Sequence, residues 1–297
     1  MSPRKVSAGA RVVRAFAGLT AFAVVLGGGA LTVSWLLGRD DRPPAVPTCW
    51  AVLDGARWNL APDQADTAAL LAGTALSRAM PARALTIGLA TGMQESRLRN
   101  IDHGDRDSVG IFQQRPSQGW GTVEEIMDPV YSTNAFFDAL VKVPAYTEME
   151  VTVAAQEVQR SAFPDAYAQH EDLARAWASA FYGYAPQAVT CSLPDAGPGD
   201  PQAVVDRAAR DLPYVPAVVS EDGVVLDAAG LGASAEDEGR LAWALAHWAV
   251  AVADPLQVQQ VRTATAVWDR EADAWLRADL TPGPAVAVSQ VLVVPAS

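Results

Sequence analysis

The chain has 297 residues and a formal net charge of −12 at pH 7, with 34 acidic against 22 basic side chains. This acidic balance argues against nucleic acid as a partner, because binding a phosphate backbone requires a basic patch. Half of the residues are apolar, and the chain is long enough for one large domain or two modest ones.

The N-terminal segment predicts a membrane anchor. Residues 15–38 contain no charged side chain and are numerous enough to cross the hydrocarbon layer as a helix. The basic tail of residues 1–14 places the N-terminus in the cytoplasm, so the rest of the chain is expected outside it. A cleaved signal peptide is the alternative, but its apolar core would be shorter and followed closely by a small-residue cleavage site. We therefore expect a single-pass protein of a bacterial cytoplasmic membrane.

Two Pro-rich stretches indicate how the remaining chain is divided. Residues 39–48 (RDDRPPAVPT) and residues 192–201 (SLPDAGPGDP) have the composition of linkers. They separate a first domain, residues 49–191, from a second domain, residues 202–297.

The chain has two cysteines, Cys49 and Cys191, and they bracket the first domain. In an oxidising compartment such a pair is expected to form a disulfide, which would tie the start of this domain to its end. Two buried free thiols are the competing interpretation.

The first domain is expected to be all α-helical apart from one hairpin signal. That signal is the run from Trp50 to Trp58, in which apolar residues flank the turn residues Asp54 and Gly55. Pro near a helix start and the apolar periodicity predict the other elements. The predicted helices cover residues 62–79, 81–98, 128–143, 152–160 and 164–181.

The second domain is expected to be a small α+β module of unknown role. Its clearest helix covers residues 236–253, where apolar residues recur at helical spacing. Residues 258–267, 275–279 and 286–294 are rich in strand-forming residues. The predicted fold class is thus mainly α: a transmembrane helix, an all-α domain and this α+β module, which could bind an envelope protein.

The residues that suggest chemistry lie at the end of the second predicted helix and in the polar, Gly-punctuated loop of residues 100–122. Glu95-Ser96 ends the helix, and Gly110-Ile111-Phe112-Gln113 follows in the loop. This pattern resembles the lysozyme superfamily, in particular soluble lytic transglycosylases and goose-type lysozymes. The resemblance covers about residues 49–191 and implies a peptidoglycan-cleaving domain with Glu95 as its catalytic acid.

The position of Glu95 supports this role independently. At helical spacing it shares a face with the small residues Ala84, Gly88 and Thr91, so another helix can approach closely. Partial burial there would raise the pKa of the carboxyl, as a general acid working near neutral pH requires. The alternative is a surface Glu paired with a nearby arginine, Arg97 or Arg99.

A second carboxylate could come from Asp105 or Asp107, since many glycosidases use a carboxylate pair. Both acids could instead cap turns. The resemblance to lytic transglycosylases implies that one Glu suffices, because the C6 hydroxyl of the substrate itself attacks and leaves an anhydro-muramyl end. The start of an EF-hand calcium loop has the same spacing as Asp105, Asp107 and Gly110. The twelfth position of that loop requires a bidentate Glu, and here it is Pro116. No metal and no cofactor is expected.

Substrate contacts are expected from the helix end and the loop. The candidates are Ser96, Gln113, Gln114, Arg115 and Trp120. Trp120 could stack on a sugar ring or fill the core instead. The Ala-Tyr-Asn-Ala-Gly motif of transglycosylases is absent from the corresponding region, which holds Gln159, Arg160 and Tyr167.

The sequence therefore predicts cleavage of the muramyl-glucosaminyl bond of peptidoglycan glycan strands. Two non-enzymatic functions remain as alternatives: a degenerate lysozyme-like domain that only binds glycan, and an envelope scaffold. Glu95 facing a groove would favour the enzyme, whereas Glu95 in an ion pair on an outer face would favour the scaffold.

Overall fold

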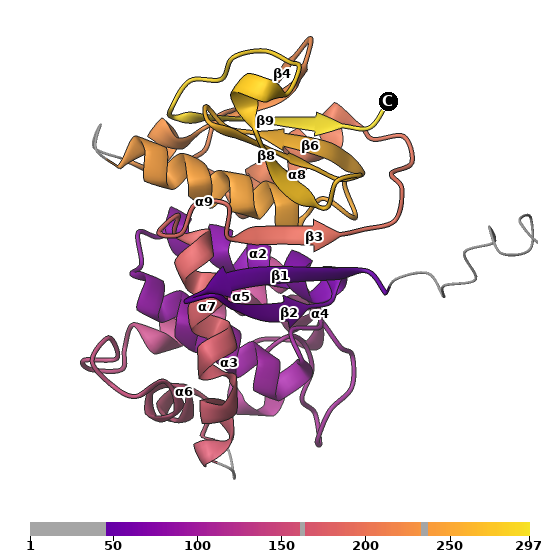
Figure 1. The fold of residues 1–297 in the computed structure, drawn as a ribbon. Coiled ribbons are helices and arrows are strands. Elements are labelled where there is room, and N and C mark those ends of the chain that lie inside the picture. Colours follow the sequence, from indigo (N-terminus) through magenta and orange to yellow (C-terminus); the bar gives the residue numbers. More distant parts are fainter. Residues whose placement is uncertain (1–45, 161–163, 233–236) are drawn as a thin grey trace, which may run out of the picture. The chain divides into compact units, whose positions relative to one another are not determined.

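The computed structural model describes residues 46–160, 164–232 and 237–297. Within these ranges the chain forms eight α-helices and two antiparallel sheets, of three and six strands (Figure 1). The predicted tail of residues 1–14 and the predicted membrane helix of residues 15–38 lie outside the described residues. Among the helices that are described, none combines the length and the apolar character that a membrane span requires.

The smaller sheet has the order β2-β1-β3, so β1 lies between its two neighbours (Figure 1). The strands are β1 (Thr48–Leu53), β2 (Ala56–Leu60) and β3 (Val189–Ser192). Asp54 and Gly55 join β1 to β2 with φ angles of 51° and 78°, a turn in which both residues need positive φ. The predicted hairpin is confirmed.

A disulfide joins Cys49 in β1 to Cys191 in β3, as the sequence predicted. The two residues face each other across the antiparallel pair, with 3.9 Å between their Cα atoms. The covalent link therefore reinforces the contact between the first and last strands of this sheet.

Most predicted helices of the first region are present within a few residues of their expected bounds. They are α2 (Pro62–Ser77), α3 (Ala82–Ser96), α5 (Pro129–Leu140), α6 (Val151–Gln159) and α7 (Glu171–Phe181). A further short helix, α4 (Val123–Met127), was not predicted. The start of α5 was predictable from its first residues. Asp128 caps the first turn by accepting hydrogen bonds from the backbone N–H groups of Val130 and Tyr131, and Pro129 has no N–H group that needs an acceptor. Residues 164–170 are a separate 3-10 helix, η2 (Pro164–His170), rather than the first half of α7.

Helix α3 is the central element of this region and packs against α2, α5, α6, α7 and η2. A Cβ atom on Gly88 would lie 3.3 Å from the ring of Phe137 in α5, so the glycine allows the two helices to approach closely. Ala84 and Thr91 on the same face are fully buried. The predicted buried face of α3, which leads to Glu95 at its end, is therefore present.

The larger sheet follows in the chain and has the order β4-β5-β9-β6-β7-β8. Its strands are β4 (Ala217–Ser220), β5 (Gly223–Asp227), β6 (Val258–Arg262), β7 (Ala266–Asp269), β8 (Ala274–Arg277) and β9 (Gln290–Pro295). Two helices accompany it, α8 (Pro201–Asp211) and α9 (Glu238–Ala251). Helix α9 packs against β6 and β9 and also against α2, α7 and β3, and residues 47–297 form one compact unit.

The expected mainly α fold class is wrong, because the described chain is an α/β protein with two antiparallel sheets. The first region is not all α either, since β3 completes a three-stranded sheet. The strands have only four to six residues, and β9 pairs with β5 although more than 60 residues separate them. Such short, distant partners leave little periodic signal in the sequence.

A buried charge cluster lies where α8 meets α2. Arg207 contacts Asp211 at 2.7 Å and Asp66 of α2 at 2.6 Å. The side chain of Asp211 is fully buried and also accepts hydrogen bonds from Arg210 and from the Trp248 indole. Each carboxylate in this cluster thus has an arginine partner.

A buried histidine lies where α9 meets the first region. His247 donates from Nδ1 to the carbonyl oxygen of Ala180 at 2.7 Å and accepts the backbone N–H of Ala188 at Nε2, at 3.1 Å. Burial lowers the pKa of His247 to about 4. The imidazole is therefore neutral near pH 7, with its proton on Nδ1.

Candidate active site

Glu95 lies in the last turn of α3, where η2 and the end of α6 meet it. Its carboxylate accepts a hydrogen bond from the hydroxyl of Tyr167 in η2, with an O–O distance of 2.7 Å. The side-chain amide of Gln159, the last residue of α6, lies near enough to the carboxyl group to lower its pKa as a hydrogen-bond donor. Tyr167 is fully buried and Glu95 is half-buried. Both partners of the carboxyl group are thus uncharged.

Burial raises the pKa of Glu95, and the hydrogen bonds from Tyr167 and Gln159 only partly oppose this rise. Within the described ranges Glu95 has no ion-pair partner, and Arg99 instead contacts Asp63 at 2.6 Å. The alternative of a surface Glu paired with a neighbouring arginine therefore does not describe this site. A raised pKa favours the protonated form, which is the form that a general acid needs.

Ser96 connects the end of α3 to the loop of residues 100–122 through hydrogen bonds. Its hydroxyl donates to the carbonyl oxygen of Ile111 at 2.7 Å and accepts the backbone N–H of Arg99 at 3.1 Å. The side chain is buried. Ser96, predicted as a substrate contact, is therefore placed as a residue that positions the loop beside Glu95.

The Gly110–Gln113 element packs directly onto the core beneath the site. Phe112 stacks on Phe136 of α5 with 4.2 Å between ring centroids, and its carbonyl oxygen accepts a hydrogen bond from Gln159 at 2.8 Å. Gln113 has a φ of 48°, and its amide donates to the carbonyl oxygen of His103. Gln159 thus connects residues 110–113, which are part of the motif that resembles the lysozyme superfamily, to the Glu95 carboxyl group.

Two other candidate substrate contacts serve the loop itself. Gln114 is buried, with only 1% of its surface exposed, and donates to the carbonyl oxygen of Ser132. Arg115 contacts Asp107 through an Nε–Oδ1 distance of 2.7 Å and also donates to Ser117. These contacts hold the loop in shape.

Neither candidate for a second catalytic carboxylate is arranged like a partner of Glu95. Asp107 accepts hydrogen bonds from Ser117 and Arg115, which hold its pKa well below the usual range. The side chain of Asp105 is 94% exposed and lies 3.8 Å from Arg106. Their charges do not figure among the causes of the raised Glu95 pKa. The described residues also contain no cluster of three or more acidic, His or Cys side chains that could hold a metal ion.

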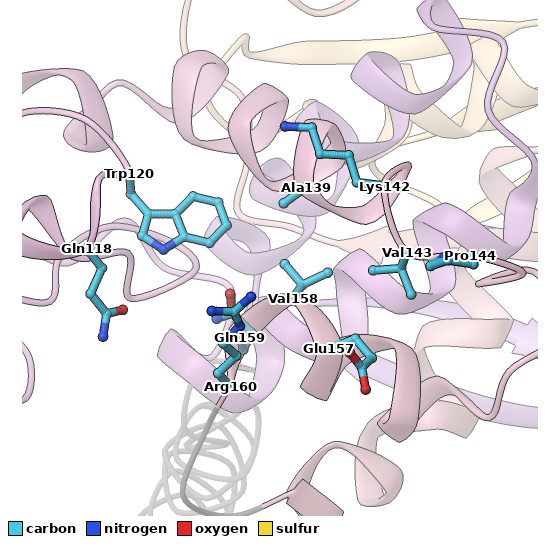
Figure 2. A pocket seen from close by; sticks show the side chains of 10 residues that line it. All are labelled: Gln118, Trp120, Ala139, Lys142, Val143, Pro144, Glu157, Val158, Gln159 and Arg160. Atoms are coloured by element: carbon cyan, nitrogen blue, oxygen red, sulfur yellow. The ribbon is translucent and has the colours of Figure 1, made fainter.

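A hollow of about 640 Å³, which we call the Trp120 groove, adjoins this site. Figure 2 shows its side chains around an open space: Trp120 and Gln118 at the left, Lys142 above, and Gln159 and Arg160 below. The rest of the lining consists of Ala139, Val143, Pro144, Glu157 and Val158. Gln159 lines the groove and also lowers the pKa of Glu95, so this one residue connects the groove to the carboxyl group, which is not itself part of the lining. Trp120, partly buried, presents a ring to the groove.

A second hollow of about 470 Å³ lies on the neighbouring side of the α3 end. Gln94 lines it, next in sequence to Glu95, and its side-chain oxygen accepts a hydrogen bond from Gln169 of η2 at 3.1 Å. His170 and Arg97 line it as well. Amide and guanidinium donors of this kind suit hydroxyl-rich ligands.

Two residues of the site were not assigned a role from the sequence. Gln159 and Tyr167 were recognised only as occupying the region of a missing motif, yet they are the hydrogen-bond partners of Glu95. They follow Glu95 by 64 and 72 residues, and no local sequence pattern predicts contacts between residues so far apart in the chain.

Compared with known proteins, the chain matches no family model and no curated protein. The resemblance to the lysozyme superfamily therefore depends on short motifs, and the argument for a function depends on the geometry of the site.

Proposed function

We propose that this protein cleaves the glycan strand of peptidoglycan at the muramyl-glucosaminyl bond, with Glu95 as the general acid. The observation that carries this proposal is a half-buried carboxyl group at a helix end, beside a groove, held only by uncharged partners. Such a group keeps a proton at a pH where an exposed Glu has lost it, and can deliver it to a glycosidic oxygen.

The positions of Asp105, which is exposed, and Asp107, which is bound within the loop, favour a lytic transglycosylase over a two-carboxylate hydrolase. In the mechanism that the resemblance implies, Glu95 first protonates the leaving oxygen as the bond to the muramyl C1 breaks. The resulting Glu95 carboxylate then takes the proton of the muramyl C6 hydroxyl, whose oxygen bonds to C1. The product carries an anhydro-muramyl end, and Glu95 has regained its proton.

Tyr167 and Gln159 fit two requirements of this cycle. Their hydrogen bonds fix the direction in which Glu95 points, and they stabilise the carboxylate that forms when the proton leaves. Since neither donor is charged, they do so without holding the group permanently ionised.

The test is digestion of purified peptidoglycan, followed by mass spectrometry of the sugar ends. Wild-type protein should release anhydro-muramyl ends, and Glu95→Gln should reduce the rate by ~10² to 10⁴, the usual contribution of positioned proton transfer. Glu148→Gln, a change of the same chemistry at an exposed position, serves as the control.

Asp105→Asn and Asp107→Asn separate the two mechanisms. If either change is as damaging as Glu95→Gln, and the products have reducing rather than anhydro ends, the protein is a two-carboxylate hydrolase. If wild-type protein releases no fragment at all, the proposed activity is wrong.

We propose further that residues 15–38 anchor the protein, with the site outside the cytoplasm. The disulfide supports this location, because disulfides persist in oxidising compartments. A reporter fused after Ser297 should be active only outside the cytoplasm, and activity inside would contradict this topology.

A further inference from the structure

The Trp120 groove carries more positive charge than the acidic chain around it suggests. Two of its lining side chains are cations, Lys142 and Arg160, and one is an acid, Glu157. Both cations are exposed, and neither forms an ion pair with any described residue. The chain as a whole has a net charge of −12, and many of its other arginines are paired with carboxylates.

The positions of the two cations follow from the ends of two helices. Lys142 comes two residues after the end of α5, and Arg160 caps the end of α6 with a φ of 52°. The side chains of both residues border the open space in Figure 2, with the ring of Trp120 beside them. Arg160 also directly follows Gln159, the residue that bonds Glu95.

An uncharged sugar gains hydrogen bonds from such cations but no charge pairing. A carboxylate gains both, because the attraction between opposite charges adds to the hydrogen bond. Local positive charge within a hollow also concentrates anionic ligands there, even when the net charge of the protein is negative.

We infer that the Trp120 groove is a subsite for a carboxylate-bearing stretch of glycan, bound by Lys142 and Arg160 while Trp120 lies against a sugar ring. The inference rests on the proposed function for the glycan, and adds that the strand must be anionic. Peptidoglycan offers two sources of this chemistry: the lactyl carboxylate of muramic acid, which is free where no peptide is attached, and the carboxylates of the stem peptides.

Three preparations of soluble strands distinguish these sources: strands bearing their stem peptides, strands stripped of peptides, and stripped strands whose lactyl carboxylates are converted to amides. Binding of each is measured by titration calorimetry with full-length Glu95→Gln protein at low ionic strength. We expect the amidated strands to bind at least about fivefold more weakly than the better of the two anionic preparations. This preference should shrink at high salt, because the cations are exposed.

Lys142→Gln and Arg160→Gln, each in the Glu95→Gln background, should lower affinity for the anionic strands by about fivefold and leave affinity for amidated strands unchanged. Arg277→Gln is the matched control, because it removes a 73% exposed arginine that lies in β8, outside the groove lining. Equal affinity for anionic and amidated strands, or variants that behave like the control, would overturn the inference.

The same strands, digested with wild-type protein, keep this result separate from the proposed function. Charge-selective binding without cleavage would refute the catalytic proposal and support the subsite. Cleavage with no dependence on strand charge would support catalysis and refute the subsite. Preference for stripped over peptide-bearing strands would identify the lactyl carboxylate as the ligand, and the reverse would identify the stem peptide.

Discussion

Two parts of this protein bury carboxyl groups, and they differ in the charge of their partners. At the end of α3, Glu95 is held by Tyr167 and Gln159, which are neutral. Where α8 meets α2, Asp211 has no exposed surface and is held by arginines. The first group adjoins the Trp120 groove, whereas the second lies inside the packed contact between helices.

The charge of the partners determines what a buried carboxyl group can do in this protein. Arginine partners offset part of the cost of burial and make the group a structural link, and removal of the carboxylate leaves a buried arginine charge without that partner. Neutral donors leave the cost of burial largely in place, which raises the pKa of Glu95 and favours its protonated form. His247 follows the same rule from the basic side, since its backbone partners leave it uncharged.

The largest effect on stability is expected at the charged cluster. Asp211→Asn should lower the free energy of unfolding by about 3 kcal/mol, because Arg207 keeps only Asp66 as a carboxylate partner. Chemical denaturation measures this loss. Asp138→Asn is the control, since its side chain is 61% exposed and such a pair contributes at most about 1 kcal/mol. Equal losses of stability from the two substitutions would show that the buried cluster contributes no more than an exposed ion pair.

His247 should make stability depend on pH in one direction. Its pKa is about 4 when folded against an ordinary 6.5, so the unfolded chain binds more protons between these values. The contribution is complete above pH 6.5 and is lost as the pH falls towards 4, by about 2 kcal/mol between pH 7 and pH 5. Denaturation over this range should show the slope in wild-type protein, and His247→Gln should reduce it. If the free energy of unfolding had the same dependence on pH in both proteins, the lowered pKa of His247 would be contradicted.

Tyr167→Phe should have a smaller effect that lies in the site itself. The hydroxyl lowers the pKa of Glu95, so its removal should raise that pKa and move the alkaline limb of the rate profile to higher pH. Turnover should fall roughly fivefold, as expected for one hydrogen bond of about 1 kcal/mol. Tyr131→Phe, whose hydroxyl bonds the backbone of Trp120 instead, should leave the position of the limb unchanged.

Local chemistry made a good part of this fold predictable. Pro129 after a capping Asp128 fixed the start of α5, and the turn at Asp54 and Gly55 was readable because positive φ restricts the residues that fit. The disulfide followed from there being only two cysteines. In each case the interaction that determines the structure either lies within a few residues along the chain or has only one possible partner.

The parts of the fold and of the site that were not predicted depend on contacts between residues far apart in the sequence. Strand β3 has four residues and owes its conformation to β1, far away in the sequence. Ser96 was predicted as a substrate contact, and no sequence pattern indicated that its hydroxyl also donates a hydrogen bond to the Ile111 carbonyl oxygen. Glu95 itself was identified correctly as a helix-end residue on a buried face, whereas its partners became visible only after folding.

The most direct measurement of the central claim is the titration of Glu95 itself. Carbon-13 NMR of protein labelled at the glutamate side-chain carboxyl carbons follows each group, and the signal missing from Glu95→Gln identifies this one. We expect a pKa clearly above the ordinary ~4.3 of glutamate, because burial without a charged partner disfavours the carboxylate. A pKa at or below that ordinary value would mean that Glu95 holds no proton to donate, and would contradict the account.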